Sequence, residues 1–210
     1  MRALKLAAVG AALVTAGAAA AYAYYRSSVD EPAKTVLIDE GEYQLRRYPP
    51  MVVAEVTHTG ARRQALEAGF KRLAAYIFAK DRPGEKIEMT SPVMQDEPEK
   101  IEMTAPVMQD GGSKSGTWRT RFVMPAGYTV DTLPPAPQDI TLTQIDERKI
   151  AAVRFSGNGT NEDLERHEAA LRAWIAGKGL VPAGAAEYAF YDAPMVPGPM
   201  RRNEVLIPVG

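Results

Sequence analysis

The chain has 210 residues, which fits one domain with an appendage, and its 46% hydrophobic and 24% charged residues are typical of a globular protein. The formal net charge of −1 provides no basic field and therefore argues against a nucleic-acid partner. No cysteine is present, which excludes disulfides, thiolate metal sites and cysteine nucleophiles.

Residues 1–28 have the features of a segment that enters a membrane. Arg2 and Lys5 form a short basic region, and residues 6–25 then carry no charge. A helix of that length can span a bilayer, and basic residues at its start stay on the cytoplasmic side. We therefore expect the rest of the chain to be exported, to the periplasm or to the extracytoplasmic face of the membrane.

Two interpretations of residues 1–28 are favoured over a third, that of a purely cytosolic soluble protein. The small-x-small sequence Ala21-Tyr22-Ala23 is typical of a signal-peptidase site and predicts a cleaved signal peptide. Without cleavage, residues 4–25 would serve as an N-terminal membrane anchor that tethers the protein. Residues 29–34 are predicted to be a linker, followed by a domain over residues 35–210.

Three strands are expected at the start of this domain, at residues 36–38, 43–48 and 51–59. The side chains of the third strand alternate between two faces, and one face carries Val52, Ala54, Val56 and His58. A long helix is then expected over residues 61–80, because an apolar stripe recurs at helical spacing through Leu66, Phe70, Leu73 and Ile77.

The region after this helix contains the same twelve-residue segment twice. EKIEMTSPVMQD begins at Glu85 and EKIEMTAPVMQD begins at Glu99, fourteen residues later. The two copies differ at one position, where Ser91 of the first copy corresponds to Ala105 of the second.

The repeated segment predicts a half-buried strand, because Ile87 and Met89 alternate with polar residues. Pro92 cannot donate a ladder hydrogen bond, so this strand should end there or lie at an edge. We expect one copy to take a strand position and the other to form a loop or hairpin arm. The sequence does not indicate which copy takes which role.

The second half of the chain repeats the pattern of the first. Strands are expected at residues 118–124, 140–145, 149–155, 187–191 and 204–209. The second helix is expected to begin with Asn161 as its N-cap and to end at Gly177 and Gly179. Each half therefore has the order β-β-α-β-β. We predict an α+β fold with two pseudo-symmetric halves, which form a mainly antiparallel, distorted barrel-like sheet with two helices.

Several motifs occur in the order found in one known family. They are the Lys-Ile-x-Met-Thr-x-Pro-Val segment, Glu42-Tyr43-x-x-Arg46-x-Tyr48, Gly69-Phe70-x-x-Leu73-x-x-Tyr76-Ile77-Phe78, Phe122-Val123-Met124-Pro125 and Arg201-Arg202-Asn203-Glu204-Val205. Together these motifs resemble the SOUL/heme-binding protein family over most of residues 35–210. The resemblance implies binding of heme or a related tetrapyrrole in a shallow apolar pocket, by a carrier, buffer or sensor that performs no chemistry.

The resemblance also implies a site. Matched by position, the heme-binding residues are Phe70 and Ala74 on the first helix and Met195 in the loop between the last two strands. Some family members place basic residues around this pocket. The corresponding positions of this chain are the uncharged or acidic residues Glu67, Ala75 and Val196.

His58 and His167 are the two histidines of the chain and are the candidate axial ligands for iron. Each is predicted to lie on an apolar face, where a histidine is usually a core residue. Their spacing does not match a zinc-binding pair. A heme can also be held without a protein ligand, because burial of its apolar face supplies most of the binding free energy.

Glu204 supports a second interpretation of the chain. Its carboxylate either forms an ion pair or lies inside a ligand cleft, as in bacterial effector-binding domains that bind amphipathic, cationic small molecules. Gly-x-Gly-x-x-Gly, P-loop and Gly-x-Ser-x-Gly motifs do not occur, so an enzyme is not expected. A tetrapyrrole-modifying enzyme remains a third interpretation, which would need a perturbed acid or base in the pocket.

Overall fold

A computed structural model describes residues 31–97, 116–192 and 196–210 of the chain. The chain divides into two compact units, Met1–Asp30 and Glu31–Gly210, and all described residues belong to the second unit. Among these residues, no helix is long and apolar enough to cross a membrane. The signal peptide or anchor expected over residues 1–28 lies outside the described residues.

In the described part of the chain, one nine-stranded sheet carries two α-helices and a short 3₁₀ helix. The strands are β1 (Thr35–Glu40), β2 (Tyr43–Tyr48), β3 (Met51–Gly60), β4 (Val93–Asp96), β5 (Gly116–Val123), β6 (Thr141–Ile145), β7 (Arg148–Ser156), β8 (Glu187–Phe190) and β9 (Arg202–Val209). The helices are α2 (Arg62–Ile77), α3 (Asn161–Gly177) and the 3₁₀ helix η1 (Gly198–Met200).

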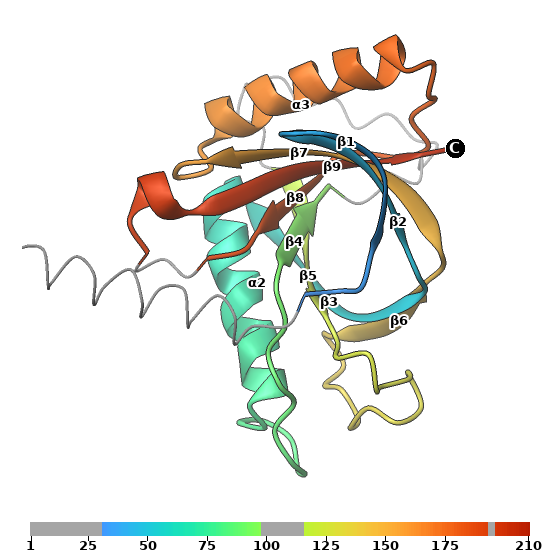
Figure 1. Cartoon of the computed structure of the whole chain (residues 1–210). Helices are drawn as coiled ribbons and strands as arrows, with labels where there is room; N and C mark the ends of the chain where they lie inside the picture. Colours follow the sequence, from blue (N-terminus) through green and yellow to red (C-terminus); the bar gives the residue numbers. More distant parts are fainter. Residues whose placement is uncertain (1–30, 98–115, 193–195) are drawn as a thin grey trace, which may run out of the picture. The chain divides into compact units, whose positions relative to one another are not determined.

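The strand order is β1-β2-β7-β9-β8-β4-β5-β3-β6, and every neighbouring pair is antiparallel. The two halves exchange their leading strands, because β2 pairs with β7 of the second half and β6 pairs with β3 of the first half. The predicted α+β class and antiparallel pairing are confirmed. The sheet is strongly bent (Figure 1) but is not a closed barrel, since β1 and β6 are free edges.

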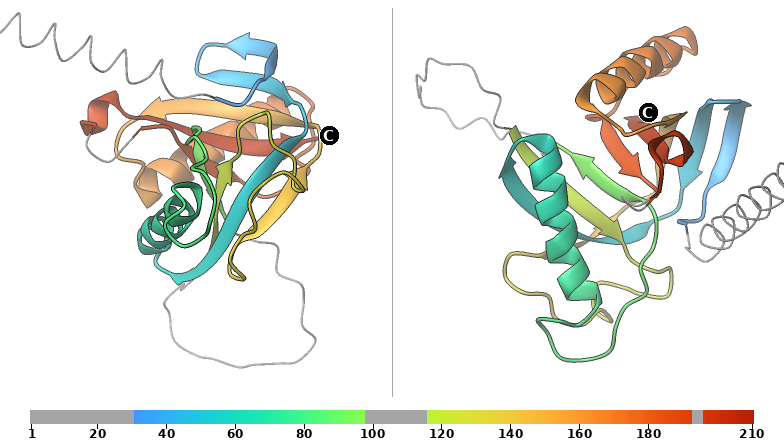
Figure 2. Two further views of the ribbon diagram at one scale, coloured as in Figure 1. Left: turned by 90° about the horizontal axis from the view of Figure 1, so that it is seen from below. Right: turned by 90° about the vertical axis from the view of Figure 1, so that its left-hand side faces the viewer.

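The two faces of the bent sheet bury different side chains because strand residues alternate between them. Val52, Ala54 and Val56 of β3 share one face, as predicted, and that face packs with α2, whereas Val53 points to the opposite, inner face. α3 packs on β7 and β9 in the same way, through residues that include Leu171. Both helices therefore cover the outer face of the sheet (Figures 1 and 2).

The helices begin and end at slightly different residues from those expected. α2 ends at Ile77, three residues before the predicted end. The N-cap of α3 is Thr160 rather than Asn161, because Thr160 and Asp163 form a capping box in which Asp163 N donates to Thr160 Oγ1 at 3.1 Å. Gly69 allows α2 to approach the sheet closely, since a Cβ there would lie 2.4 Å from Thr120 Oγ1.

The strand expected around Ile87 and Met89 is wrong, because the strand of the first copy is β4, which begins after Pro92. Side-chain anchoring explains why the alternation was misleading. Ile87 is 1% exposed and its N–H donates to Ile77 O at 2.7 Å, while Thr90 Oγ1 donates to Val123 O. An extended segment can thus alternate buried and exposed residues without pairing in the sheet.

The first copy of the repeat fills the strand position. β4 lies between β5 and β8 and joins the two halves of the sheet. The second copy lies outside the described residues. The one residue that differs between the copies has a role here, because Ser91 is buried and its Oγ donates to Tyr191 O at 3.3 Å. Ala105 could not make that hydrogen bond.

Deleting residues 85–98 should leave a folded domain in which the second copy takes the place of β4. The connection to β5 would then be residues 111–115, a five-residue loop that suits an antiparallel hairpin. The only lost side-chain bond is that of Ser91, worth about 1 kcal/mol. Thermal unfolding should show a midpoint within about 4 °C of the unaltered chain.

Two variants serve as controls for this deletion. Ser91→Ala in the full chain should lower the midpoint by the same amount, and Ala105→Ser in the deleted chain should restore it. A midpoint lowered by much more than about 8 °C, the shift for roughly 2 kcal/mol, would mean that both copies are structural.

Candidate functional site

The predicted residues Phe70 and Ala74 lie on one edge of α2, where they are partly buried against the core that α2 forms with β3 and β5. Leu66 and Phe78 continue the same four-residue spacing. Phe78 is 38% exposed, and the Phe70 ring meets Phe122 edge-on at a centroid distance of 5.4 Å. Leu66, Phe70 and Ala74 of α2, together with Phe78 at the C-cap of the helix, form an apolar stripe that a ligand could reach from solvent. This stripe is called the α2 edge below.

Charged residues flank the α2 edge, and two of them, Arg63 and Lys71, were not predicted to belong to the site. Arg63, Glu67 and Lys71 are exposed at four-residue spacing on α2, and Arg63 Nε donates to Glu67 Oε1 at 3.2 Å. Ala75 is half-buried and Val196 is buried, so neither matched position supplies a cation. The cations are supplied by α2 itself, through Arg63 and Lys71. The i, i+4 spacing of Arg63, Glu67 and Lys71 in the sequence could have indicated this.

The other predicted site residues are not assembled around the α2 edge by the described structure. Met195 lies outside the described residues. His58 is on β3, near Asp139, and Asp139 accepts hydrogen bonds from Arg72. Arg72 is two residues from Phe70, so it projects from nearly the opposite side of α2. His58 is therefore not brought to the apolar stripe.

His167 is held in the packing of α3 on the sheet. Its ring stacks on Phe155 of β7 with centroids 3.9 Å apart and planes inclined by 9°. Its Nδ1–H donates to Asp163 O at 2.6 Å, which leaves Nε2 as the nitrogen with lone-pair character. Among the described residues there is no cluster of three or more His, Cys, Asp or Glu that could hold a metal ion.

The inner face of the sheet buries the carboxylate of Glu204 in an ion pair. Arg46 Nη1 and Nη2 donate to its two oxygens at 2.6 and 3.0 Å, and the two side chains are 3% and 2% exposed. Tyr191 adds a third bond, with its hydroxyl donating to Glu204 Oε2 at 2.8 Å. Of the two roles considered for Glu204, the structure shows the ion pair, so this carboxylate is already neutralised.

Burial and ion pairing shift the pKa of Arg46 in opposite directions. Desolvation lowers the pKa of its guanidinium, but the hydrogen bonds and charge of Glu204 outweigh it and raise the pKa above its usual value. Arg46 therefore stays charged, and it also donates to Tyr48 Oη at 3.3 Å. The two tyrosines remain protonated at neutral pH, because burial raises the pKa of both Tyr48 and Tyr191.

A second group of charges lies on the same face. It consists of three arginines and three carboxylates from five strands, namely Arg119, Arg121, Arg148, Glu55, Asp96 and Glu187. Arg148 binds Glu187 end-on, with Nη1–Oε1 and Nη2–Oε2 distances of 2.5 and 2.9 Å. The positive and negative groups are equal in number, so this network carries no net formal charge.

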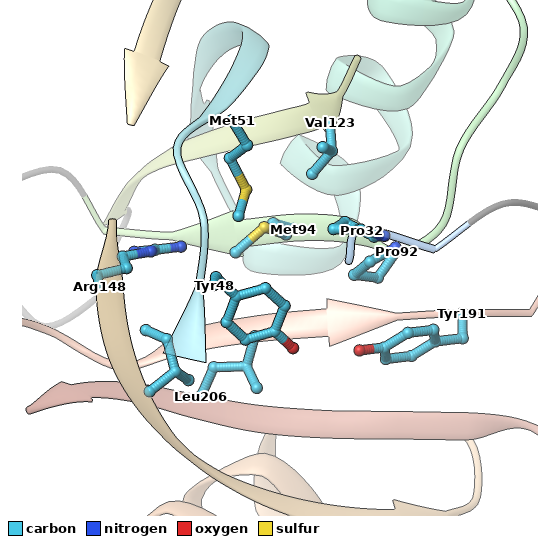
Figure 3. Close-up of a pocket in the computed structure, with 10 residues that line it drawn as sticks. Pro32, Tyr48, Met51, Pro92, Met94, Val123, Arg148, Tyr191 and Leu206 are labelled. Carbon is cyan, nitrogen blue, oxygen red and sulfur yellow. The ribbon is translucent and has the colours of Figure 1, made fainter. Parts of the chain in front are cut away.

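An apolar pocket lies on the inner face near both charged groups. Figure 3 shows its lining, with the hydroxyls of Tyr48 and Tyr191 pointing toward one another and the methionines above them. The lining residues are Pro32, Tyr48, Met51, Pro92, Met94, Val123, Arg148, Ile150, Tyr191 and Leu206. Its volume is about 20 Å³, which is room for one water molecule. A macrocycle cannot enter this pocket in the observed conformation.

Comparisons with known proteins identify a family and support the fold. A family model described as SOUL heme-binding protein matches residues 29–208. No curated protein matches the chain. The crystal structure of the EcmrR C-terminal domain has a TM-score of 0.60 at 12% identity, covering 80% of this chain and 96% of that one. A hydrolase from Listeria innocua has a TM-score of 0.54 at 10% identity, covering 83% and 94%. At these identities the likeness concerns the fold alone.

Glu204→Gln should destabilise the protein strongly, because it leaves the Arg46 charge buried without a counter-charge. We expect the free energy of unfolding to fall by about 3 kcal/mol or more, measured by denaturant unfolding. The double variant Arg46→Met with Glu204→Leu should recover most of this loss, since it removes both charges. A single variant as stable as the unaltered chain would contradict the assigned pairing.

Proposed function

The chain belongs to the SOUL heme-binding protein family, and from this premise we propose that it binds heme or a related tetrapyrrole as a carrier, buffer or sensor. The observation that carries the proposal is the family match over residues 29–208, which spans nearly the whole described part of the chain. The proposal is one of binding without chemistry on the ligand.

We place the tetrapyrrole on the α2 edge. Leu66, Phe70 and Ala74 would hold one apolar face of the macrocycle, and burial of apolar surface contributes about 2.5 kcal/mol for each 100 Å². Arg63 and Lys71 flank the stripe on the solvent side and are suited to bind the carboxylates of the ligand. Met195, outside the described residues, remains the proposed contact from the loop between β8 and β9.

Iron ligation is proposed to be weak or absent on the protein side. The described structure does not bring His58 to the α2 edge, and His167 is engaged by Phe155 and Asp163. Contact with the macrocycle would then supply the affinity, and exchange of the ligand would be easy. Such behaviour suits a carrier or buffer better than an enzyme that fixes its cofactor.

Ala74→Glu should weaken hemin binding at least about tenfold, which corresponds to roughly 1.4 kcal/mol. The new carboxylate would be buried against the macrocycle without a partner, which is unfavourable. Hemin titration followed by Soret absorbance measures the effect. The matched control is Ala68→Glu, which adds the same group to the other side of α2 and should leave the affinity unchanged.

Further variants separate ligation from packing. His58→Ala and His167→Ala should leave the Soret maximum in place, because neither side chain is proposed to hold the iron. A shift of the Soret band in one of them would identify an axial ligand instead. If the mixture of hemin and unaltered protein has the spectrum of free hemin, the proposed function is wrong.

We also propose that the domain acts outside the cytoplasm, on the basis of Arg2, Lys5 and the uncharged residues 6–25. Mass spectrometry of the protein isolated from its natural host should show either the loss of residues 1–23 or the complete chain in the membrane fraction. The two results correspond to a signal peptide and to an anchor. A complete chain in the cytoplasmic fraction would contradict export.

A further inference from the structure

The segment Glu31–Lys34 contributes one residue to the wall of the pocket on the inner face. Pro32 is one of its lining residues and lies beside Pro92 in Figure 3. Glu31 holds the segment in place, because its Oε1 accepts from Arg202 Nη2 at 2.5 Å and its Oε2 accepts from Lys34 Nζ at 3.0 Å. The chain thus puts an apolar ring into the pocket and a carboxylate beside it.

Hydrogen-bond donors around this pocket are incompletely used. The Nε atoms of Arg202 and Arg148 are buried and have no hydrogen-bond partner among the described residues. The Tyr48 hydroxyl accepts from Arg46 Nη1 and so keeps its own hydrogen for donation. Arg202 stacks on Tyr191, which lines the pocket, whereas Arg148 lies toward the opposite end of the β7–β9 ladder, where it pairs with Glu187. A buried donor without a partner is unfavourable. A group that pairs with the Arg202 Nε–H has to be an acceptor.

The geometry at Arg202 favours a carboxylate as that acceptor. A guanidinium binds a carboxylate best through two parallel N–H groups, as Arg46 does with Glu204. Glu31 uses only Nη2 of Arg202 and shares its second oxygen with Lys34, which leaves Nε free. A carboxylate that is not tethered to the chain could use both Nε and Nη2. The guanidinium also lies 3.5 Å above the Tyr191 ring, which fixes its orientation.

The rest of the pocket suits the apolar part of such a molecule. Its lining includes Val123, Ile150 and Leu206 together with Met51 and Met94. Methionine side chains are flexible and adapt to irregular apolar shapes. The volume of about 20 Å³ applies while Pro32 is in place, so an alkyl chain can enter only when the segment leaves.

We propose that this pocket is a binding site for a monocarboxylate with an alkyl chain, of the medium-chain fatty acid class, and that the segment Glu31–Lys34 is its intramolecular competitor. The carboxylate of the ligand binds Arg202 in place of Glu31, and the alkyl chain of the ligand takes the place of Pro32. A cation is disfavoured, because Arg46 already neutralises Glu204. The site lies on the inner face of the sheet and shares no residue with the α2 edge. This proposal can therefore be tested independently of heme binding.

Because the segment Glu31–Lys34 is covalently attached to the domain, its competition lowers the apparent affinity of a free ligand. A segment attached by a short linker has an effective concentration in the millimolar range, against which the ligand must compete. Glu31→Gln removes the charge that holds the segment, without touching the pocket. An exposed ion pair of this kind contributes a factor of about two to five in an equilibrium constant. The variant should therefore bind the ligand about two- to fivefold more tightly.

The test is a titration of the full chain, carrying ¹³C-methyl methionine, with decanoate. The methyl signals of Met51 and Met94 should shift, and those of Met89 and Met124, which pack on the α2 side of the sheet, should not. Decyltrimethylammonium, which has the same chain length and the opposite charge, should leave all four signals unchanged. Glu31→Gln should tighten decanoate binding by the factor given above.

Variants of Arg202 test the anchoring guanidinium. Arg202→Met should weaken decanoate binding at least about tenfold. The affinity of Arg202→Lys for decanoate should lie between those of Arg202→Met and the unaltered chain, since lysine keeps the charge but lacks the two parallel N–H groups of a guanidinium. Hemin absorbance should be unchanged in both, which distinguishes failure of this site from failure of the proposed function. The proposal is overturned if decanoate leaves Met51 and Met94 unshifted even in Glu31→Gln, if the cation binds equally well, or if Arg202→Lys and the unaltered chain bind alike.

Discussion

The bent sheet depends on pairing the charges that its inner face buries. Removing an ion from water costs several kcal/mol, so each buried charge needs a close and well-oriented partner. Arg46 and Glu204 meet this requirement across 158 positions of sequence, and together they fasten β2 to β9 through β7. Arg148 and Glu187 do the same between β7 and β8. A face filled in this way is specific in geometry, because a shift of one residue in any of these strands would separate the partners.

The exchange of leading strands is the second determinant of the architecture. Because β2 pairs with the second half and β6 with the first, neither half can form a complete sheet alone. The helices stay on the outer face and the charged groups on the inner face, so the molecule offers two chemically different surfaces. The α2 edge is an apolar stripe bordered by cations, whereas the inner pocket is a small apolar space with unused donors.

Local sequence patterns predicted most helices and strands, but they could not predict contacts between residues that are distant in the sequence. The alternation in β3 and the stripe in α2 describe a single segment, so both could be recognised from the sequence. The same alternation failed around Ile87, where Thr90 and the end of α2 anchor an extended segment outside the sheet. The partnership of Arg46 with Glu204 could not be predicted, because nothing in either local sequence indicates which strands become neighbours. Placing Pro32 in a linker missed its packing in the pocket for the same reason.

The fourteen-residue repeat gives the sheet two chemically similar occupants for one position. Because the spacing is even and the side chains are nearly identical, the second copy would present the same residues to β5 and β8 if it replaced the first, with Asp110 at the position of Asp96 opposite Arg119. Two arrangements are compared, one with the first copy and one with the second copy at the position of β4. Their free-energy difference comes from the hydroxyl of Ser91 and from the redistribution of fourteen residues between the flanking loops. Loop closure entropy changes slowly with length, so these contributions are each of the order of 1 kcal/mol. The duplication therefore provides a second copy of the sequence that forms β4, at a spacing that preserves the register of β4 with β5 and β8 if one copy replaces the other.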